Sequence, residues 1–244
     1  GDLEEAFVLT MQAFNLTEKY QIPVIVLVDK YLMEGHATVD YTKMSTNATQ
    51  FKIDRGNLLD SEALLSDKDY KRYSLTSDGV SPRSLPGQQG GIALSGSDEH
   101  DERGLYNEES EIRKAMMQKR FKKVEGILHD ISRQEIIGDK DAELMLITFG
   151  STKMPCLDAL EYLRREGKKI SLLSMTCVDP FPIEQIMPLL SLPAKKLVVE
   201  ANFSGQLEAL LREKTGFVPH DRMRKYDGRP FYAEEIVAKV KDTL

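Results

Sequence analysis

A continuous apolar run at residues 24–28 constrains the fold of this chain more than any other feature. Four of its five residues are β-branched, and it lies between Pro23 and the polar Asp29. Such a run is typical of a parallel strand that is buried on both faces. Residues 2–19, which precede it, predict a helix because apolar residues recur there at helical spacing. The chain therefore opens with a helix–strand pair.

The predicted helix at residues 2–19 begins with a capping box, in which Asp2 is the cap and Glu5 lies three residues later. A single helix and strand cannot bury their apolar faces, because a parallel strand of this kind needs neighbours on both sides. Residues 36–138 offer few strong strand candidates. We therefore expect the chain to be a segment of a longer polypeptide, and its start without a methionine agrees with that expectation.

Residues 36–110 have little periodic apolar pattern and many turn formers. A structureless stretch of this length is uncommon in a compact domain, unless it is a functional loop, a linker or an arm that packs on a partner. We favour the arm. Residues 108–125 then predict an amphipathic helix. Its apolar side carries Ile112, Met116, Met117 and Phe121.

From residue 140 onward, strand and helix patterns alternate along the chain. Strands are expected at 142–149, 169–175 and 196–202, with a short extended segment after Gly216. Helices are expected at 153–166, 183–190, between the cap Ser204 and the stop Gly216, and at 233–240. Strands that are separated by helices of this length indicate a parallel sheet with right-handed crossovers. The predicted fold class is α/β, with a doubly wound, mostly parallel sheet.

Composition limits the classes of function. The 244 residues are 41% hydrophobic and 30% charged, which suits one large or two small globular domains. The net charge of −6 has both signs interspersed, so a nucleic-acid or anionic-membrane partner is not expected. No apolar run is long enough to span a membrane and the start is not that of a signal peptide, so we expect a cytoplasmic protein. Two cysteines are too few for a four-cysteine iron–sulfur cluster.

The turn formed by Gly150, Ser151 and Thr152 is the first candidate binding site. It lies between a predicted strand and a predicted helix, where backbone N–H groups and a helix N-terminus can hold an anion. However, it lacks both the GxGxxG spacing and the Lys-Ser/Thr ending of a P-loop. A plain strand-to-helix turn is the favoured interpretation.

Two charged segments are further candidate sites. Residues 98–102, Asp-Glu-His-Asp-Glu, contain groups that bind divalent ions, but five consecutive residues cannot all converge on one ion. We expect no metal site there, and favour a solvated or partner-facing acidic turn. The basic run at residues 113–123 could hold an anionic cofactor such as coenzyme A. A solvated helix face is the simpler interpretation.

The arm carries three candidate interface residues, Arg72, Arg83 and His100. Guanidinium groups recognise carboxylates or phosphates through paired hydrogen bonds. Docking of the arm on a neighbouring subunit is the favoured role, because the arm is long and non-periodic. No Ser or Cys has an adjacent His in a GxSxG-like context, so nucleophilic hydrolysis has no support.

Five segments, taken in order, resemble successive motifs of the alpha subunit of 2-oxoacid:ferredoxin oxidoreductases, most closely the 2-oxoglutarate synthase type. They cover nearly the whole chain, which makes the resemblance more specific than any single motif. The segments are PVIVLVDKYLMEG (23–35), YKRYSLTSDGVSPRSLPG (70–87), SDEHDERG (97–104), VVEANFSGQLEALLREKTG (198–216) and KYDGRPF (225–231).

The resemblance implies a domain organisation. In this family the alpha subunit is similar to transketolase-type enzymes. Residues 1–35 look like the last helix and strand of a truncated domain that binds the thiamine pyrimidine ring. Residues 36–138 are the irregular connecting arm, and residues 139–244 look like a transketolase-C-type α/β domain.

The resemblance also implies a reaction, the oxidative decarboxylation of a 2-oxoacid with coenzyme A to an acyl-CoA, carbon dioxide and reduced ferredoxin. Thiamine diphosphate stabilises the carbanion. By resemblance, its diphosphate, the Mg²⁺ and the iron–sulfur cluster belong to a beta subunit, and this chain alone is expected to bind none of them.

This sequence departs from the complete family pattern in one respect. The Tyr-Pro-Ile-Thr-Pro motif, the Glu that activates thiamine and the Arg that holds the substrate carboxylate have no counterpart in this chain. We therefore expect no catalytic residue here and no activity of the chain alone. The alternatives are a relative that acts on pyruvate or branched 2-oxoacids, and a stand-alone α/β module that binds a nucleotide or acyl-CoA without catalysis.

Overall fold

The computed structural model describes the whole chain from Gly1 to Leu244. The chain divides into two compact units. One unit comprises residues 1–9, 27–49 and 132–244, and the other comprises residues 10–26 and 50–131. None of the helices combines the length and the apolar character needed to cross a lipid bilayer.

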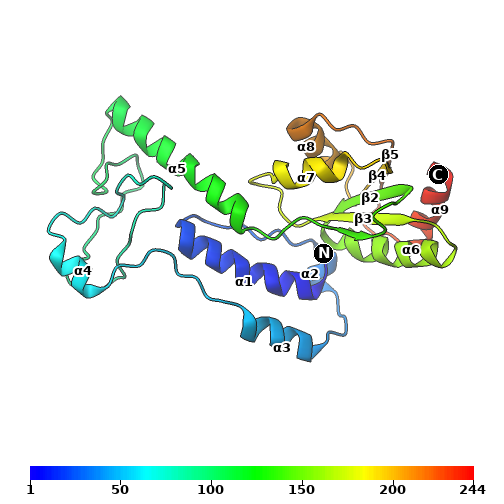
Figure 1. Cartoon of the computed structure of the whole chain (residues 1–244), viewed down its shortest axis with the longest axis horizontal. Helices are drawn as coiled ribbons and strands as arrows, with labels where there is room; N and C mark the ends of the chain where they lie inside the picture. The colour runs from blue at the N-terminus through cyan, green and yellow to red at the C-terminus, as the bar shows by residue number, and fades with distance from the viewer. The chain divides into compact units, whose positions relative to one another are not determined.

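The first unit is built on a five-stranded sheet with the strand order β1-β3-β2-β4-β5 (Figure 1). The neighbours among β2 to β5 are parallel, and β1 pairs antiparallel with β3 at one edge. The chain passes from β2 to β3 on one side and then places β4 on the other side of β2, so the switch point lies between β2 and β4. The strands are β1 (Ile136–Gly138), β2 (Leu144–Phe149), β3 (Ile170–Met175), β4 (Lys195–Glu200) and β5 (Asp221–Arg224).

Helices cover both faces of this sheet. Alternate residues of a strand point to opposite faces, so Leu144 and Leu146 enter the core beneath α6 and α9, whereas Met145 and Ile147 enter the core beneath α7 and α8. These four side chains are at most 1% exposed, which accounts for the continuous apolar pattern of β2. The predicted doubly wound α/β fold is confirmed. The helices are α6 (Lys153–Arg165), α7 (Ile183–Leu190), α8 (Gln206–Thr215) and α9 (Ala233–Thr243).

Several predicted boundaries in this unit are corrected. The strand expected at 196–202 ends at Glu200, because Asn202 begins a turn whose side-chain oxygen accepts the N–H group of Gly205 at 2.7 Å. The prediction that Ser204 caps the following helix is wrong, because α8 begins at Gln206 with Gly205 at the N-cap position. Asn202 Oδ1 accepts the Gln206 N–H group at 3.1 Å. The short antiparallel strand β1 was not predicted at all.

Residues 24–28 form neither a helix nor a strand and pair with no strand of this chain. Ile25 is 81% exposed and Leu27 is 78% exposed. A strand is defined by hydrogen bonds to a neighbouring backbone, and no neighbour is present within these 244 residues. The predicted strand is therefore wrong for this chain taken by itself, although the apolar pattern that suggested it is real.

The second unit contains most of α1 (Leu3–Tyr20), with α4 (Ser61–Ser66) and α5 (Ser110–Asp130). α1 and α5 approach closely, because a Cβ atom at Gly126 would lie only 2.7 Å from the Tyr20 ring. The Tyr20 hydroxyl donates to Asp130 Oδ2 at 2.7 Å, and its carbonyl accepts from Lys123 Nζ at 2.8 Å. This crossing is the polar centre of the unit.

The helices at the two ends of this unit match their predictions. Asp2 caps α1 by accepting the Glu5 N–H group at 2.8 Å, and α5 occupies the predicted amphipathic segment with one further turn. The arm is less irregular than expected. It contains the short helices α3 (Tyr41–Gln50) and α4, and another short helix, α2 (Lys30–Glu34), precedes it. None of the three has the apolar periodicity that would have revealed it.

Candidate functional site

The turn Gly150–Thr152 lies at the carboxyl end of β2 and forms a 3-10 turn that leads into α6. Gly150 adopts a φ of +63°, a conformation that glycine tolerates best. The Ser151 N–H group donates to Asp29 Oδ2 at 2.8 Å, and the other Asp29 oxygen accepts the Leu32 N–H group at 3.0 Å. The turn does hold an anion, as its geometry permits, but the anion is a carboxylate of the same chain.

The electrostatics of this carboxylate agree with its position. Burial alone would raise the pKa of Asp29, but the donors at Leu32 and Ser151 outweigh burial and hold the pKa below its ordinary value. Asp29 therefore stays ionised and also caps α2. Because Asp29 directly follows residues 24–28, the turn after β2 is tied to the exposed apolar run.

The start of α6 is held by a buried cation, Lys153. Its Nζ atom lies 2.7 Å from Asp2 Oδ2 and 2.9 Å from Glu5 Oε1. Burial lowers the pKa of Lys153, but the two carboxylates outweigh burial and the pKa is raised. The first turn of α1 is thus anchored to the first turn of α6 by a charged network that sequence reasoning did not predict.

The other helix that faces the switch point, α8, is also capped from within the chain. Glu200 is 1% exposed, and its carboxylate accepts the N–H groups of Leu207 at 2.7 Å and Glu208 at 3.0 Å. Asn202 Nδ2 donates to the same carboxylate at 2.9 Å. Glu208 in turn accepts from Arg224 Nη2 at 2.7 Å. With both helix N-termini occupied by the chain's own carboxylates, the switch point does not favour the alternative of a stand-alone nucleotide-binding module.

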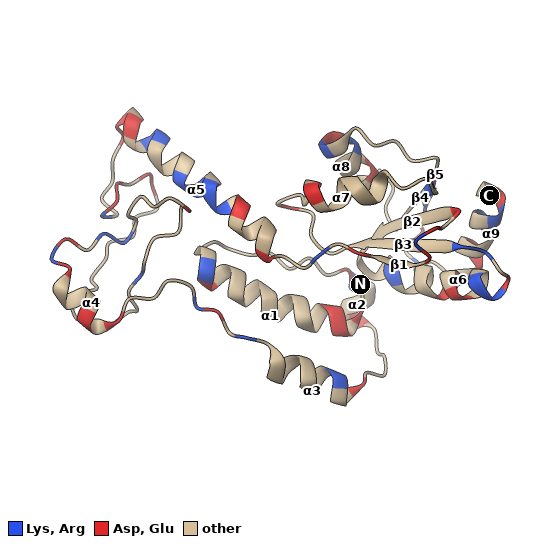
Figure 2. Cartoon of the chain, in the orientation of Figure 1, with Lys and Arg blue, Asp and Glu red and all other residues tan.

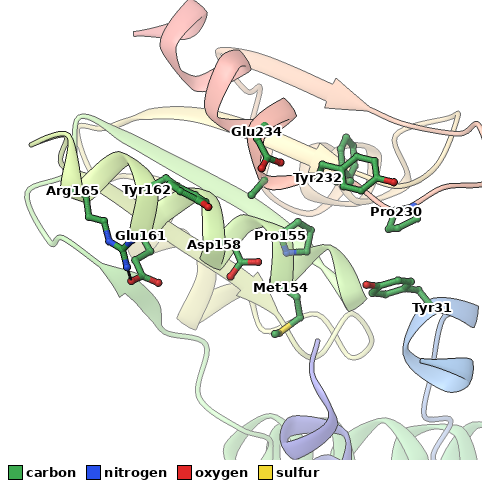
Figure 3. A pocket seen from close by; sticks show the side chains of 12 residues that line it. Tyr31, Met154, Pro155, Asp158, Glu161, Tyr162, Arg165, Pro230, Tyr232 and Glu234 are labelled. Atoms are coloured by element: carbon green, nitrogen blue, oxygen red, sulfur yellow. Dashed lines mark hydrogen bonds and ion pairs between the residues drawn. The ribbon is translucent and has the colours of Figure 1, made fainter. Parts of the chain in front are cut away.

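A cavity of about 510 Å³ lies between the outer side of α6 and the start of α9 (Figure 3). Tyr31 and Pro230 stand at one end, and the ion pair between Glu161 and Arg165 stands at the other. Its size is that of a small-molecule site. Its lining contains no His, Cys, Ser or Lys, and its ionisable groups are the carboxylates of Asp158, Glu161 and Glu234 together with Arg165 and the tyrosines. The lining residues are Tyr31, Met154, Pro155, Asp158, Glu161, Tyr162, Arg165, Pro230, Phe231, Tyr232, Ala233 and Glu234.

The two arginines of the arm both contact the carboxyl-terminal end of α1. Arg72 Nη1 donates to Gln21 Oε1 at 2.6 Å. Arg83 forms an ion pair with Glu18, and its Nη2 atom also donates to the Arg55 carbonyl at 3.2 Å. These contacts hold the arm against its own chain. Their role at a subunit interface stays a prediction.

His100 is brought together with the first part of the arm. Its ring packs on Tyr73 with a centroid distance of 4.1 Å. Glu102 accepts the Leu75 N–H group at 2.9 Å and lies 3.2 Å from Lys71 Nζ. The acidic turn at residues 98–102 therefore contacts residues 71–75 and holds that part of the arm in place. Nowhere in the chain do three His, Cys, Asp or Glu side chains gather closely enough to bind a metal ion.

The basic face of α5, along which Figure 2 shows several Lys and Arg residues, is only partly solvated. Glu99 lies 2.6 Å from Arg113 Nη1 and also pairs with Arg120. The Arg120 guanidinium, with help from Arg113, lowers the pKa of Glu99 to about 2. Lys119 and Lys123 are each only 8% exposed. The prediction of a solvated basic face holds for the exposed Arg113, Lys114, Arg120 and Lys122, but it is wrong for Lys119 and Lys123. The pattern of charge along a sequence does not show which side chains a loop will cover.

Comparisons with known proteins agree with the fold and with the sequence motifs. Residues 1–119 match the family described as pyruvate flavodoxin/ferredoxin oxidoreductase, thiamine diP-bdg. Residues 142–236 match the family described as pyruvate:ferredoxin oxidoreductase core domain II. The two matches together span most of the chain.

Individual relatives extend the likeness over the full length. The alpha subunit of 2-oxoacid:ferredoxin oxidoreductase 2 from Aeropyrum pernix is 38% identical over 100% of this chain and 37% of its own length. The corresponding subunit from Saccharolobus solfataricus is 35% identical over 99% of this chain and 38% of its own length. The chain thus spans under two fifths of the length of these relatives.

A solved structure is similar as well. It is the 2-oxoglutarate:ferredoxin oxidoreductase from Magnetococcus marinus with 2-oxoglutarate, coenzyme A and succinyl-CoA bound. It is 31% identical, and the match has a TM-score of 0.84 over 99% of this chain and 41% of the other. On these sequence and structural grounds, the chain belongs to the family of 2-oxoacid:ferredoxin oxidoreductase alpha subunits.

Proposed function

We propose that this chain is the carboxyl-terminal part of the alpha subunit of a thiamine-diphosphate-dependent 2-oxoacid:ferredoxin oxidoreductase. The enzyme would oxidatively decarboxylate 2-oxoglutarate with coenzyme A to succinyl-CoA, carbon dioxide and reduced ferredoxin. The observation that carries this proposal is the match over 99% of the chain to a structure that binds 2-oxoglutarate, coenzyme A and succinyl-CoA. The cytoplasm, where ferredoxin and coenzyme A are both available, is the proposed location.

We propose that the residues of this chain do not by themselves hold the diphosphate of the thiamine cofactor or its Mg²⁺. The helix N-termini beside the switch point are filled by Asp29 and Glu200, and no cluster of metal-binding side chains is present. We therefore assign the diphosphate, the Mg²⁺ and the iron–sulfur cluster to a beta subunit. The proposed role of this chain is structural: it would supply the carboxyl-terminal part of the alpha subunit. The chain alone would be inactive.

Residues 24–28 support a structural role of this kind. With Ile25 at 81% and Leu27 at 78% exposure, this run presents apolar side chains together with backbone groups that form no hydrogen bond within the chain. Such a segment can add to the edge of a sheet in another polypeptide segment. We propose that residues 1–35 complete the sheet of a pyrimidine-binding domain, that residues 36–138 form the connecting arm, and that residues 139–244 form the carboxyl-terminal α/β domain.

The function is tested by reconstitution. The chain would be produced together with the preceding alpha-subunit segment and a beta subunit, and the reduction of a viologen dye would be followed. Reduction that requires both 2-oxoglutarate and coenzyme A is expected from the assembly, and none from the chain alone. An assembled complex that reduces the dye only with pyruvate would contradict the proposed substrate, and one without any activity would contradict the function.

The assembly role has its own test. Ile25→Asp places a charge on the exposed run, where it removes no packing within the chain, so that folding of the chain alone should be unchanged. Binding to the preceding segment should weaken about tenfold or more, because burying an unpaired carboxylate is costly. Met187→Asp on α7, where Met187 is 41% exposed, is the control. Equal binding of both variants, measured by analytical ultracentrifugation, would contradict a pairing role for residues 24–28.

A further inference from the structure

Three buried or half-buried cations in the second unit, Arg72, Lys119 and Lys123, have no ion pair with a carboxylate. Lys119 and Lys123 are each 8% exposed, and no ion pair joins either of them or Arg72 to an acidic side chain. Lys123 Nζ donates to the Tyr20 carbonyl at 2.8 Å, and Arg72 Nη1 donates to Gln21 at 2.6 Å, so both have only neutral acceptors. The Lys119 ammonium has no such acceptor.

The loop at residues 70–81 brings these groups together. It crosses α5 so closely that a Cβ atom at Gly79 would lie 2.2 Å from the Lys119 carbonyl oxygen, and Gly79 has a φ of +78°. Only glycine fits this crossing without strain. The loop therefore places Asp78, the residue before Gly79, beside the turn of α5 that carries Lys119. Arg72 lies near Lys123, because Arg72 donates to Gln21 and Lys123 donates to the carbonyl of the preceding residue, Tyr20.

The charges around Lys119 are unbalanced. Its neighbours are Arg72 and Asp78 from the loop, and Arg120 and Lys123 from α5, of which Arg120 is already paired with Glu99. Burial first, and then the positive charges of Lys123, Arg72 and Arg120, lower the pKa of Lys119 to about 8, with Asp78 acting in the opposite direction. Burial also lowers the pKa of Lys123.

Among the other buried cations of the chain, Lys196 is 3% exposed and has only the backbone carbonyls of Leu192 and Ala194 as acceptors, but it stands alone and not in a cluster. Other buried or bridging cations are paired with carboxylates. Lys153 has two carboxylates within 3 Å, and Arg113 and Arg120 share Glu99. Buried charges in proteins are normally paired, because desolvation without a partner is costly. Arg72, Lys119 and Lys123 against the single Asp78 leave two positive charges uncompensated, which equals the charge of a phosphate dianion.

We propose that Arg72, Lys119 and Lys123 form a binding site for a phosphate-bearing ligand, either a phosphate monoester or a diphosphate. The guanidinium fork and the ammonium groups suit the oxygens of such a group, since both form charge-assisted hydrogen bonds to it. The site lies within the unit formed by residues 10–26 and 50–131. It does not depend on the proposed enzymatic function.

The site is tested by isothermal titration calorimetry of inorganic phosphate and pyrophosphate into the full 244-residue chain. Saturable binding is expected for the wild type. Lys119→Gln should weaken it about tenfold, as the loss of one charge-assisted hydrogen bond would. Lys114→Gln is the matched control, because Lys114 is exposed on the same helix and faces no such cluster.

Proton uptake on binding distinguishes phosphate bound at this site from phosphate attracted to exposed basic side chains. At pH 8 about half of Lys119 is neutral, so phosphate binding should take up protons, and the measured heat should depend on the ionisation enthalpy of the buffer. Lys119→Arg should still bind phosphate but lose this uptake, because arginine does not titrate there. It also serves if the Gln variant fails to fold.

Three results would overturn the proposal. They are the absence of saturable phosphate binding by the wild type, unchanged binding and proton uptake in the folded Lys119→Gln chain, and binding of acetate as tight as that of phosphate.

Discussion

The buried carboxylate of Glu200 provides the sharpest test of how the α/β domain is held together. Two backbone N–H groups of α8, those of Leu207 and Glu208, end on this carboxylate, and Asn202 supplies a third donor. Glu200→Ala removes all three acceptor contacts and leaves the two N–H groups without a partner in a site that is 1% exposed at Glu200.

The magnitude follows from these contacts. Hydrogen bonds to a charged group contribute about 1.5–3 kcal/mol each, and a lost N-cap costs about 1 kcal/mol. Asn202 can turn toward water, so the two backbone donors dominate. Glu200→Ala should therefore lower the free energy of unfolding by about 3–5 kcal/mol. Glu200→Gln keeps one acceptor oxygen and should cost roughly half as much.

Urea unfolding followed by far-UV circular dichroism is the assay, because the chain contains no tryptophan to serve as a fluorescent probe. Glu161→Ala is the control, since its ion pair with Arg165 is exposed on both sides and should contribute less than about 1 kcal/mol. A loss at Glu200→Ala of under about 1 kcal/mol, or a loss as large for Glu161→Ala, would refute the assignment of Glu200 as the cap of α8.

Three further changes test other contacts. In the wild type, Arg120 lowers the folded-state pKa of Glu99 to about 2, so the stabilisation by ionised Glu99 is lost as the pH falls from 4.5 toward 2. Glu99→Gln should therefore lose less stability over this pH interval, which urea midpoints at several pH values would measure. Gly205→Ala should lower the melting temperature, since φ is +72° and the new Cβ would lie 2.3 Å from Arg224 Nη2. Without an anion, the wild type should gain stability as the pH rises from about 8 to 10.5, whereas Lys119→Met should not, because the folded state sheds the buried proton first.

The parallel part of the fold could be predicted because its signals are local. The strands β2, β3 and β4 are buried on both faces and therefore read as continuous apolar runs, and glycine or proline separates them from the helices. The edge strand β1 could not be predicted, because it has only three residues, none of them is buried, and it pairs only with β3.

The site residues were harder to predict for a physical reason. Gly150–Thr152 was correctly placed at a strand-to-helix turn, but the anion that it holds, Asp29, lies more than 100 residues earlier and no local pattern links the two. The burial of Lys119 and Lys123 depends on a loop whose path is fixed by Gly79. Contacts between residues far apart in the sequence determine which charged side chains are buried and which are paired. Such contacts cannot be inferred from one sequence alone.

The hydrogen bond from Ser151 to Asp29 links the residue that follows the apolar run 24–28 to the turn that follows β2, so a change in the position of one affects the other. A polypeptide that pairs with Leu27 and Val28 would immobilise the next residue, Asp29, and thereby restrict the backbone at the end of β2. Docking at the apolar run would thus stiffen the entrance to α6 without any direct contact there. Subunit assembly and the local rigidity of the α/β domain would rise together.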